Sequence, residues 1–440
     1  MKIKSFCGTL SILVLNLIDS TSAVSDPCEC TSLVLQGGKC QDSFSQAVSD
    51  NNGVIHFAGT HEIASAMRFR GDLDVRGVEC DNEGRAKIIG AYSSESNGMF
   101  SPQGPSRISI SFQGFDITSK EGEFVSALRT SGGEGDSGEM YVTFRASDIR
   151  AYGMWNKRLG AVFFIGNIGG LAGESRIDDS CMFWDNKIES TQTELYHGGA
   201  VLCVQYIEDK AELYVGGEYK GNTAFYTGGS KHCTGGAVYI DTNEGSVITG
   251  KKARFEDNVS NQGGAISINS NVGSIDFQST FKANKALDQG EGARAGAVRV
   301  FNLGPGSTTI LSGEFIDNLS DVDGGVMATN IIGAGAHLVF SGVFSNNTSL
   351  HTGAVMSQWS QYTNEGLTQV LASAKVYNNT ATYDMRSNLF KFTSGPSLVS
   401  EEDLVPGVTW SWQGSKDVPV PEVKTLYDDT WKQRRRRTVT

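Results

Sequence analysis

The strongest constraint on the fold of this chain is a two-part repeat that recurs seven times between Gly160 and Asn379. Its first part is an aromatic residue, two variable residues and an asparagine. Its second part is Gly-Gly-Ala, or a close variant, followed by an aliphatic residue. The repeat asparagines lie 26 to 36 residues apart, so the anchors are constant while the segments between them vary in length. Such self-similarity predicts a solenoid of stacked coils.

The first part of the repeat is predicted to place an asparagine at a bend of every coil. A bend asparagine can stack on its counterpart in the next coil, and the stacked amides then form a hydrogen-bonded ladder. Seven positions are assigned to this ladder: Asn186, Asn222, Asn258, Asn284, Asn318, Asn347 and Asn379.

The second part is predicted to turn the chain sharply just before a β-strand. Glycine adopts backbone angles that are closed to other residues, and it permits close backbone approach. The alternation in Ala237-Val238-Tyr239-Ile240, repeated after the other glycine pairs, is a strand pattern. We expect the alanines to stack in register, facing the interior; they are Ala200, Ala237, Ala265 and Ala297. The glycines assigned to the turn are Gly199, Gly236, Gly264, Gly296, Gly325 and Gly353.

This alternation of Phe-x-x-Asn with Gly-Gly-Ala-(Ile/Leu/Val) resembles the repeat of the chlamydial polymorphic outer membrane proteins over residues 160–385. The resemblance implies an all-β fold, a right-handed parallel β-helix (solenoid) of the pectate-lyase-like kind. Each coil then adds one strand to a sheet, with loops of variable length between strands. The resemblance also implies a surface or adhesive role. The alternative is a β-sandwich with ordinary glycine-rich turns.

The bacterial proteins of that family end in a membrane β-barrel, whereas only about 55 residues follow the last repeat here, too few for eight strands. A secreted protein with the repeat alone is therefore expected. Residues 1–23 read as a signal peptide, because Lys2 and Lys4 precede an apolar run and Thr21-Ser22-Ala23 suits cleavage. No later segment is apolar enough to span a membrane, so we expect no transmembrane segment after signal removal.

The rest of the chain divides into one long domain and its two ends. Residues 24–50 are assigned to a Cys-rich N-terminal cap with a short helix near Asp42–Val48, for which Asp42 is the expected N-cap. Residues 51–385 form the β-helix, and its early strands are expected at 54–57, 73–75, 87–90, 108–112 and 141–144. Residues 386–431 form a C-terminal cap, with a final strand at 408–412, and residues 432–440 form a basic tail.

The cysteines that follow the signal peptide suit an oxidising compartment, because all of them lie in the front half of the chain. The disulfide candidates are Cys28, Cys30, Cys40, Cys80, Cys181, Cys203 and Cys233. Their connectivity stays open, and an odd number leaves one thiol free or paired between chains. The competing interpretation is a zinc site at Cys28, Cys30 and Cys40, but this set lacks a paired CxxC and a nearby histidine. We expect no metal and no cofactor.

Five asparagines stand in N-glycosylation sequons, and three of them belong to the predicted ladder. An asparagine that stacks inside a bend is a poor acceptor. The glycosylation candidates are therefore Asn346 and Asn378, which are expected to point outward.

The net charge and the motifs narrow the range of functions that this chain can have. The net charge of −12 argues against binding to nucleic acid. The weak catalytic candidates are Asp178, Asp179 and His197, since the acids and the histidine are expected about one coil apart and thus side by side. They lack the further residues that an acid, a base and a subsite require.

Two functions remain for the chain. The first is a secreted, non-enzymatic surface, matrix or adhesive protein that binds polysaccharide or a surface protein. The second is a polysaccharide lyase or glycoside hydrolase of the pectate-lyase-like class, since parallel β-helices host both. An enzyme needs carboxylates or basic residues clustered across neighbouring coils, whereas a structural solenoid scatters them.

Overall fold

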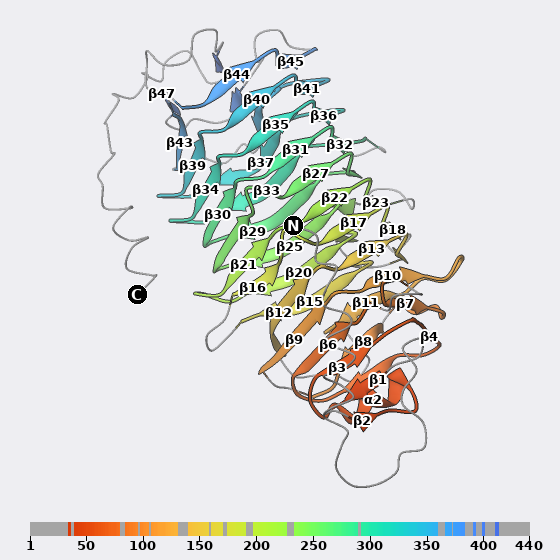
Figure 1. The fold of residues 1–440 in the computed structure, drawn as a ribbon. Coiled ribbons are helices and arrows are strands. Elements are labelled where there is room, and N and C mark those ends of the chain that lie inside the picture. The colour runs from red at the N-terminus through yellow and green to blue at the C-terminus, as the bar shows by residue number, and fades with distance from the viewer. Residues whose placement is uncertain are drawn as a thin grey trace, which may run out of the picture.

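The computed structural model describes residues 34–412 except 37–38, 80–83, 96, 105–106, 131–139, 158–159, 170–173, 191–196, 227–232, 289–291, 360–365, 372, 383–389, 393–397 and 401–409. The signal peptide, Cys28, Cys30, Cys80 and the basic tail lie outside these residues. The described chain forms a parallel β-solenoid, in which coil follows coil from the red N-terminal end to the blue C-terminal end (Figure 1). The predicted all-β solenoid is confirmed, and the handedness of its winding stays a prediction.

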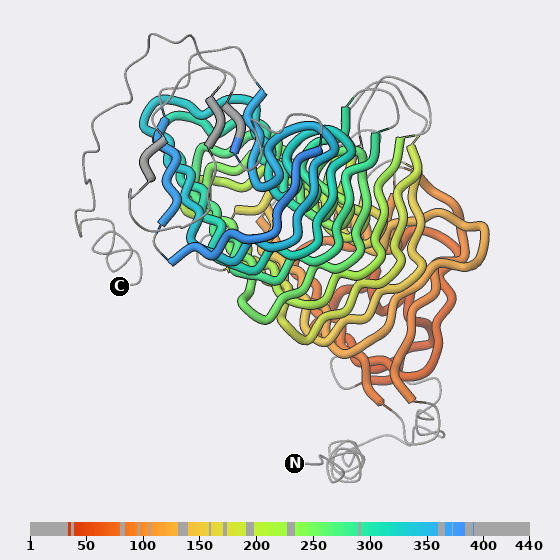
Figure 2. Tube along the Cα trace, turned by 90° about the horizontal axis from the view of Figure 1, so that it is seen from above, coloured from red at the N-terminus to blue at the C-terminus, as the bar shows by residue number. Residues whose placement is uncertain are grey.

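From β14 onward the coils pass through three stacked sheets, and Figure 2 shows the successive turns of the chain lying side by side. The 11-stranded sheet carries the aromatic residue of the repeat and is called the aromatic sheet. Its strands are β4 Thr60–Ile63, β7 Lys87–Gly90, β10 Asp116–Ser119, β13 Arg150–Tyr152, β17 Met182–Trp184, β22 Glu218–Lys220, β27 Arg254–Glu256, β31 Thr280–Lys282, β35 Glu314–Ile316, β40 Val343–Ser345 and β44 Lys375–Tyr377.

The 8-stranded sheet follows the asparagine bend and is called the short-strand sheet. Its strands are β14 Trp155–Asn156, β18 Lys187–Ser190, β23 Thr223–Tyr226, β28 Val259–Ser260, β32 Lys285–Ala286, β36 Leu319–Ser320, β41 Thr348–Ser349 and β45 Thr380–Ala381. In two coils a further short pair, β19 His197–Gly198 and β24 Cys233–Thr234, precedes the next sheet.

The 27-stranded sheet is called the main sheet, and most coils cross it with two consecutive strands. The first strands are β5 Met67–Phe69, β8 Gly98–Pro102, β11 Ser126–Arg129, β15 Phe163–Ile168, β20 Leu202–Ile207, β25 Val238–Asn243, β29 Ile266–Asn271, β33 Val298–Leu303, β37 Met327–Thr329, β38 Ile331–Ile332, β42 Met356–Gln358, β46 Phe390–Phe392 and β48 Trp410–Trp412. The second strands are β3 Ile55–Phe57, β6 Leu73–Gly77, β9 Arg107–Gln113, β12 Tyr141–Ser147, β16 Ser175–Ile177, β21 Glu212–Val215, β26 Ser246–Thr249, β30 Ser274–Phe277, β34 Thr308–Leu311, β39 His337–Phe340, β43 Leu367–Val370 and β47 Leu398–Ser400.

The N-terminal end of the stack is covered by a short helix and two antiparallel strands, β1 Val34–Gln36 and β2 Lys39–Cys40. Helix α2 (Phe44–Asp50) buries Phe44, Ala47 and Val48, and the Phe44 ring contacts Phe57 at 4.8 Å between centroids. The predicted helix is therefore confirmed, but Asp42 is not its N-cap. Ser43 has the extended backbone of an N-cap, and its hydroxyl accepts the backbone N–H of Gln46.

The early strands of the sequence prediction are also confirmed, as β3, β6, β7, β9 and β12. At the other end, Trp410–Trp412 pairs in parallel with Phe390–Phe392, as the predicted final strand should. Because β46, β47 and β48 all join the main sheet, the solenoid strands extend beyond residue 385.

The asparagine ladder runs through the core side of the bend between the aromatic and short-strand sheets. Each ladder amide donates forward to the side-chain oxygen of the next rung, at 2.8 to 3.0 Å over six steps from Asn186 to Asn379. Each also donates backward, to a carbonyl of the preceding coil; Asn258 donates to the Tyr219 carbonyl at 2.9 Å. From Asn186 to Asn347 the amides are thus satisfied inside a fully buried bend, which stabilises the stacking register.

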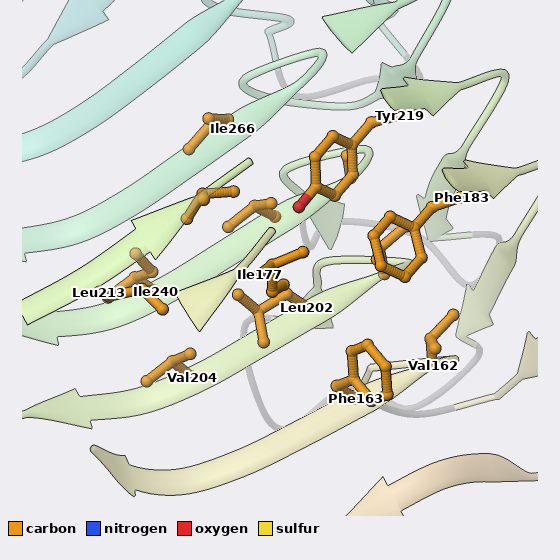
Figure 3. Packing of buried hydrophobic residues seen from close by; sticks show 14 of the residues in the cluster. Val162, Phe163, Ile177, Phe183, Leu202, Val204, Leu213, Tyr219, Ile240 and Ile266 are labelled. Carbon is orange, nitrogen blue, oxygen red and sulfur yellow. The ribbon is translucent and has the colours of Figure 1, made fainter. Parts of the chain in front are cut away.

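The aromatic residues of the repeat stack directly upon one another behind the ladder. From Tyr219 through Phe344 the rings lie 4.5 to 5.2 Å apart and within 7° of parallel. The spacing matches the distance between neighbouring strands, so identical side chains in register produce the column. Figure 3 shows the Phe183 and Tyr219 rings at the edge of the aliphatic interior.

The alanine register differs from the expectation at one position. Ala237, Ala265 and Ala297 are linked by backbone hydrogen bonds and are fully buried. Leu202 pairs with Val238, however, so Val201 rather than Ala200 stands beside Ala237. The coils align through a residue with left-handed φ. In one coil this residue is Gly199, the second glycine of its pair, and in the next coil it is Gly235, the first glycine of its pair.

Two glycine roles follow from this alignment. Gly199 and Gly353 have φ of +67° and occupy the left-handed column, where a side chain would be strained. The other four, Gly236, Gly264, Gly296 and Gly325, occupy the next column, where the neighbouring backbone approaches so closely that a Cβ would overlap a carbonyl oxygen.

Tyr219 is the one tyrosine in the ring column, and its position predicts a gain in stability. Its hydroxyl is buried without a hydrogen-bond partner among the described residues, and burial raises its pKa well above the usual value. Tyr219→Phe should therefore raise stability by about 1 kcal/mol in urea unfolding, because a desolvated hydroxyl is removed. The control is Tyr214→Phe, which loses a surface hydrogen bond to Asp179. A lower urea midpoint for Tyr219→Phe would contradict the packing described.

Candidate binding surface on the main sheet

The catalytic candidates do not lie side by side. Ile177 pairs with Val215 of the next coil, so Asp178 and Asp179 follow the second main-sheet strand and lie beside the turn at Gly216. His197 belongs to β19, which precedes the first main-sheet strand of the next coil. His197 comes 19 residues after Asp178, which is about half a coil. The two strands of the main sheet therefore lie between the two places. The expectation that these residues meet is wrong.

The two acids have structural partners instead. Arg176 forms ion pairs with Asp178 and Glu174, and its guanidinium lies 3.9 Å from the centre of the Tyr214 ring. The Tyr214 hydroxyl donates to Asp179 at 2.9 Å. Burial, and then this hydrogen bond, raises the pKa of Tyr214 to about 12. The acids therefore hold a surface network at the edge of the main sheet.

Two of the disulfide candidates are free thiols. Cys181 and Cys203 are buried and unpaired. Cys203 stands in register with Phe164 and Tyr239 of the adjacent coils, so neither neighbour offers a thiol. The prediction of disulfides at Cys181 and Cys203 is wrong. Cys40 is disulfide-bonded. The pairing of Cys28, Cys30, Cys80 and Cys233 stays a prediction.

The outer face of the main sheet carries large side chains that alternate with the core residues along the first strands. At the start of these strands the outward column is itself buried, and it includes Phe164, Cys203, Tyr239, Ser267 and Arg299. Arg299 is only 2% exposed, lies 4.5 Å from the centre of the Phe301 ring and donates to the Ser267 hydroxyl at 3.1 Å. This column acts as a second, smaller core outside the sheet.

The next outward column is partly exposed and contains aromatic, amide and carboxylate groups. Asp241 accepts from the Tyr239 hydroxyl at 2.9 Å and from the Asn269 amide at 3.0 Å. Phe301 follows one coil on, and its ring lies 5.7 Å from that of Trp359. One hydrogen bond between coils therefore links Asp241 to Asn269, and ring packing holds Phe301 and Trp359.

Arg294 packs against this group from the side of the glycine turn. Its guanidinium lies 4.5 Å from the centre of the Trp359 ring. The bridge register places Arg294 beside Asp323 and Asp323 beside Thr352, whose hydroxyl donates to the Asp323 carboxylate. Burial lowers the pKa of Arg294, and the charges of Asp323 and Asp288 oppose that shift. We call Asp241, Asn269, Arg294, Phe301 and Trp359 the main-sheet cluster.

The main-sheet cluster was missed in the sequence. Its signal was available in part, because Phe301 occupies an outward position of a strand whose alternation is plain. Trp359 lies just after a strand end, and only the stacking register shows that it meets Phe301 and Arg294. In the part of the chain that the structure describes, no group of three or more histidine, cysteine or acidic residues is arranged to hold a metal ion.

The comparisons with known proteins add no relative, since no family model, curated protein or solved structure matches this chain. Within the described residues, no helix is long and apolar enough to cross a membrane.

Proposed function

We propose that this chain is a secreted, non-enzymatic binding protein that holds carbohydrate chains against the outer face of its main sheet. The observation that carries the proposal is the main-sheet cluster, in which two partly exposed rings lie beside an arginine, an amide and a carboxylate. Aromatic rings and a few placed polar groups are the usual lining of sites that bind small polar molecules such as sugars.

The arrangement along the solenoid favours an extended ligand. Asp241, Asn269 and Phe301 come from successive coils, and neighbouring strands lie about 4.8 Å apart. A polymer that lies along the stack would meet such side chains at regular intervals. A polysaccharide offers repeated hydroxyl groups to the amide and carboxylate, and apolar ring faces to Phe301 and Trp359.

The proposal also includes the family resemblance of the repeat and the handedness of the solenoid. The ladder and the ring column are built from the first part of the motif that resembles the repeat of the chlamydial polymorphic outer membrane proteins, and a pectate-lyase-like, right-handed winding belongs to the same proposal. Secretion and an adhesive or matrix role rest on the N-terminal signal read from the sequence and on this resemblance.

Binding without cleavage is supported by the placement of the acids. Asp178 is paired with Arg176, Asp179 accepts from Tyr214, and both lie across the main sheet from His197. In the main-sheet cluster Asp241 accepts two hydrogen bonds, and beside it Asp323 accepts from Thr352. These contacts suit fixed binding groups rather than a mobile acid and base.

The test is binding of the purified chain to an array of plant, fungal, algal and animal glycans, followed by titration of the best polymer. We expect Trp359→Ala to weaken binding at least about tenfold, since an aromatic anchor at the centre of a site commonly contributes that much. The control is Trp184→Ala, which removes a partly exposed indole from the outer face of the aromatic sheet and should bind like wild type.

Two results would contradict this function. Equal losses for Trp359→Ala and Trp184→Ala would place the ligand elsewhere or reflect a general effect on the fold. No glycan bound, together with binding to a purified surface protein that Trp359→Ala weakens, would assign the same face to a protein partner.

A further inference from the structure

We propose that the folded protein carries N-linked glycans at two sites, Asn346 and Asn378, and at none of its ladder sequons. The inference rests on the secretion proposed above, and it concerns a different face of the solenoid from the binding surface. The evidence is the opposite placement of the two classes of sequon at one bend of the coil.

The residues just before the ladder asparagines form an exposed ridge, called the corner ridge, where the aromatic sheet meets the short-strand sheet. All of them have left-handed φ, between +54° and +64°. They are Asp185, Gly221, Asp257, Ala283, Asp317, Asn346 and Asn378. Asparagine, aspartate and glycine suit this backbone best, which explains five aspartates and asparagines among seven residues.

Asn346 and Asn378 are the last two members of the ridge, and both side chains are exposed. They stand on neighbouring coils, since the backbone N–H of Asn346 donates to the carbonyl of Tyr377 at 3.3 Å. Each begins an Asn-Asn-Thr sequon, and the third residues, Thr348 and Thr380, are at least partly exposed. An amide here can carry a large polar substituent in solvent without disturbing any packing.

The other three sequons begin at ladder asparagines and cannot carry a glycan in the folded state. Asn258, Asn318 and Asn347 are fully buried. The amide nitrogen of each donates both to the next rung and to a carbonyl of the preceding coil, so a linked sugar would break the ladder and clash with the core. Their third residues are the serines Ser260, Ser320 and Ser349, whose hydroxyls bond to buried carbonyls.

Glycans are added to chains before folding is complete, so the folded state acts as a filter. A chain modified at a ladder asparagine would lose a rung and leave the secretory pathway as misfolded protein. A chain modified at Asn346 or Asn378 would fold. The corner ridge joins the aromatic and short-strand sheets, so its glycans would leave the main sheet free to bind.

The experiment is secretion of the full chain from a eukaryotic host, behind a signal that the host recognises. Peptide mapping after enzymatic deglycosylation should show conversion to aspartate at Asn346 and Asn378, and none at Asn258, Asn318 or Asn347. Asn346→Asp and Asn378→Asp should each remove one glycan, which is seen as faster migration of the protein on a denaturing gel. Aspartate suits the site, because it is the native ridge residue at Asp185, Asp257 and Asp317.

A glycan at any ladder sequon in folded, secreted protein would overturn the inference, and so would unmodified Asn346 and Asn378 in that protein. Titration of the same samples with the polysaccharide ligand separates failure of this inference from failure of the binding function. We expect the double variant Asn346→Asp with Asn378→Asp to bind the array polymer as wild type does, whichever sites are modified.

Discussion

Replacement of one ladder asparagine in the middle of the stack should destabilise the protein by about 3 kcal/mol or more. In Asn258→Ala, the Tyr219 carbonyl loses its side-chain donor but keeps its place in the strand ladder, and the backbone N–H and amide of Asn222 lose the oxygen that accepts both. Both Asn222 donors remain buried, and each unsatisfied buried group costs about 1–3 kcal/mol. The measurement is the midpoint of urea unfolding followed by circular dichroism.

The matched control is the last described rung. Asn379 makes the same contacts with Asn347 and the Phe344 carbonyl, but its side chain is partly exposed. Water can replace the lost bonds there, so Asn379→Ala should cost clearly less than Asn258→Ala. Equal midpoints for these two variants would show that the ladder adds little to stability.

Addition of a single methyl group at a glycine of the close-approach column should have a comparable effect. A Cβ on Gly264 would lie 2.1 Å from the Gly296 oxygen and 2.6 Å from the Lys285 nitrogen. Both atoms belong to backbone held by neighbouring strands, so neither can move without breaking interstrand hydrogen bonds. We expect Gly264→Ala to lower stability by about 3 kcal/mol, measured as the shift in melting midpoint.

Gly306→Ala separates the clash from the loss of glycine itself. Gly306 has a left-handed φ of +71°, and a Cβ there would meet nothing within 4 Å. Its replacement should cost only about 1 kcal/mol, the penalty for a side chain in that backbone region. The same column holds alanine at Ala200 and Ala354. A Gly264→Ala protein as stable as wild type would mean that the coil relaxes at Gly264 too.

The repeat was sufficient to predict the solenoid, because both anchor residues of its first part are direct consequences of stacking. An asparagine at every bend and an aromatic residue three positions earlier are useful only if identical residues meet in adjacent coils. The structure shows both columns, from Asn186 to Asn379 and from Phe183 to Phe344.

The register of the turn could not be predicted from the motif alone. The letters Gly-Gly-Ala invite alignment of Ala200 with Ala237, but the backbone aligns by its left-handed residue, so Gly199 stands beside Gly235. The same limit explains the error at Asp178 and His197. Distance along the sequence does not give a position within a coil unless the coil length is known.

The binding surface was harder still, since it depends on contacts between loops and strands of different coils. Arg294 precedes a glycine turn, and Trp359 follows a strand two coils later. Their contact needs the stacking of three coils, and no local pattern records it. The corner ridge was easier, because each of its residues is next to a ladder asparagine.

The central claim is that the main sheet binds a polysaccharide and leaves it intact. The direct measurement is release of reducing ends or unsaturated products from the polymer that binds best, with and without calcium, alongside its binding isotherm. The account predicts saturable binding that Trp359→Ala weakens, and no product above the protein-free control over a long incubation. Product formation by wild type that Asp179→Asn abolishes would contradict it and make the chain a carbohydrate-active enzyme.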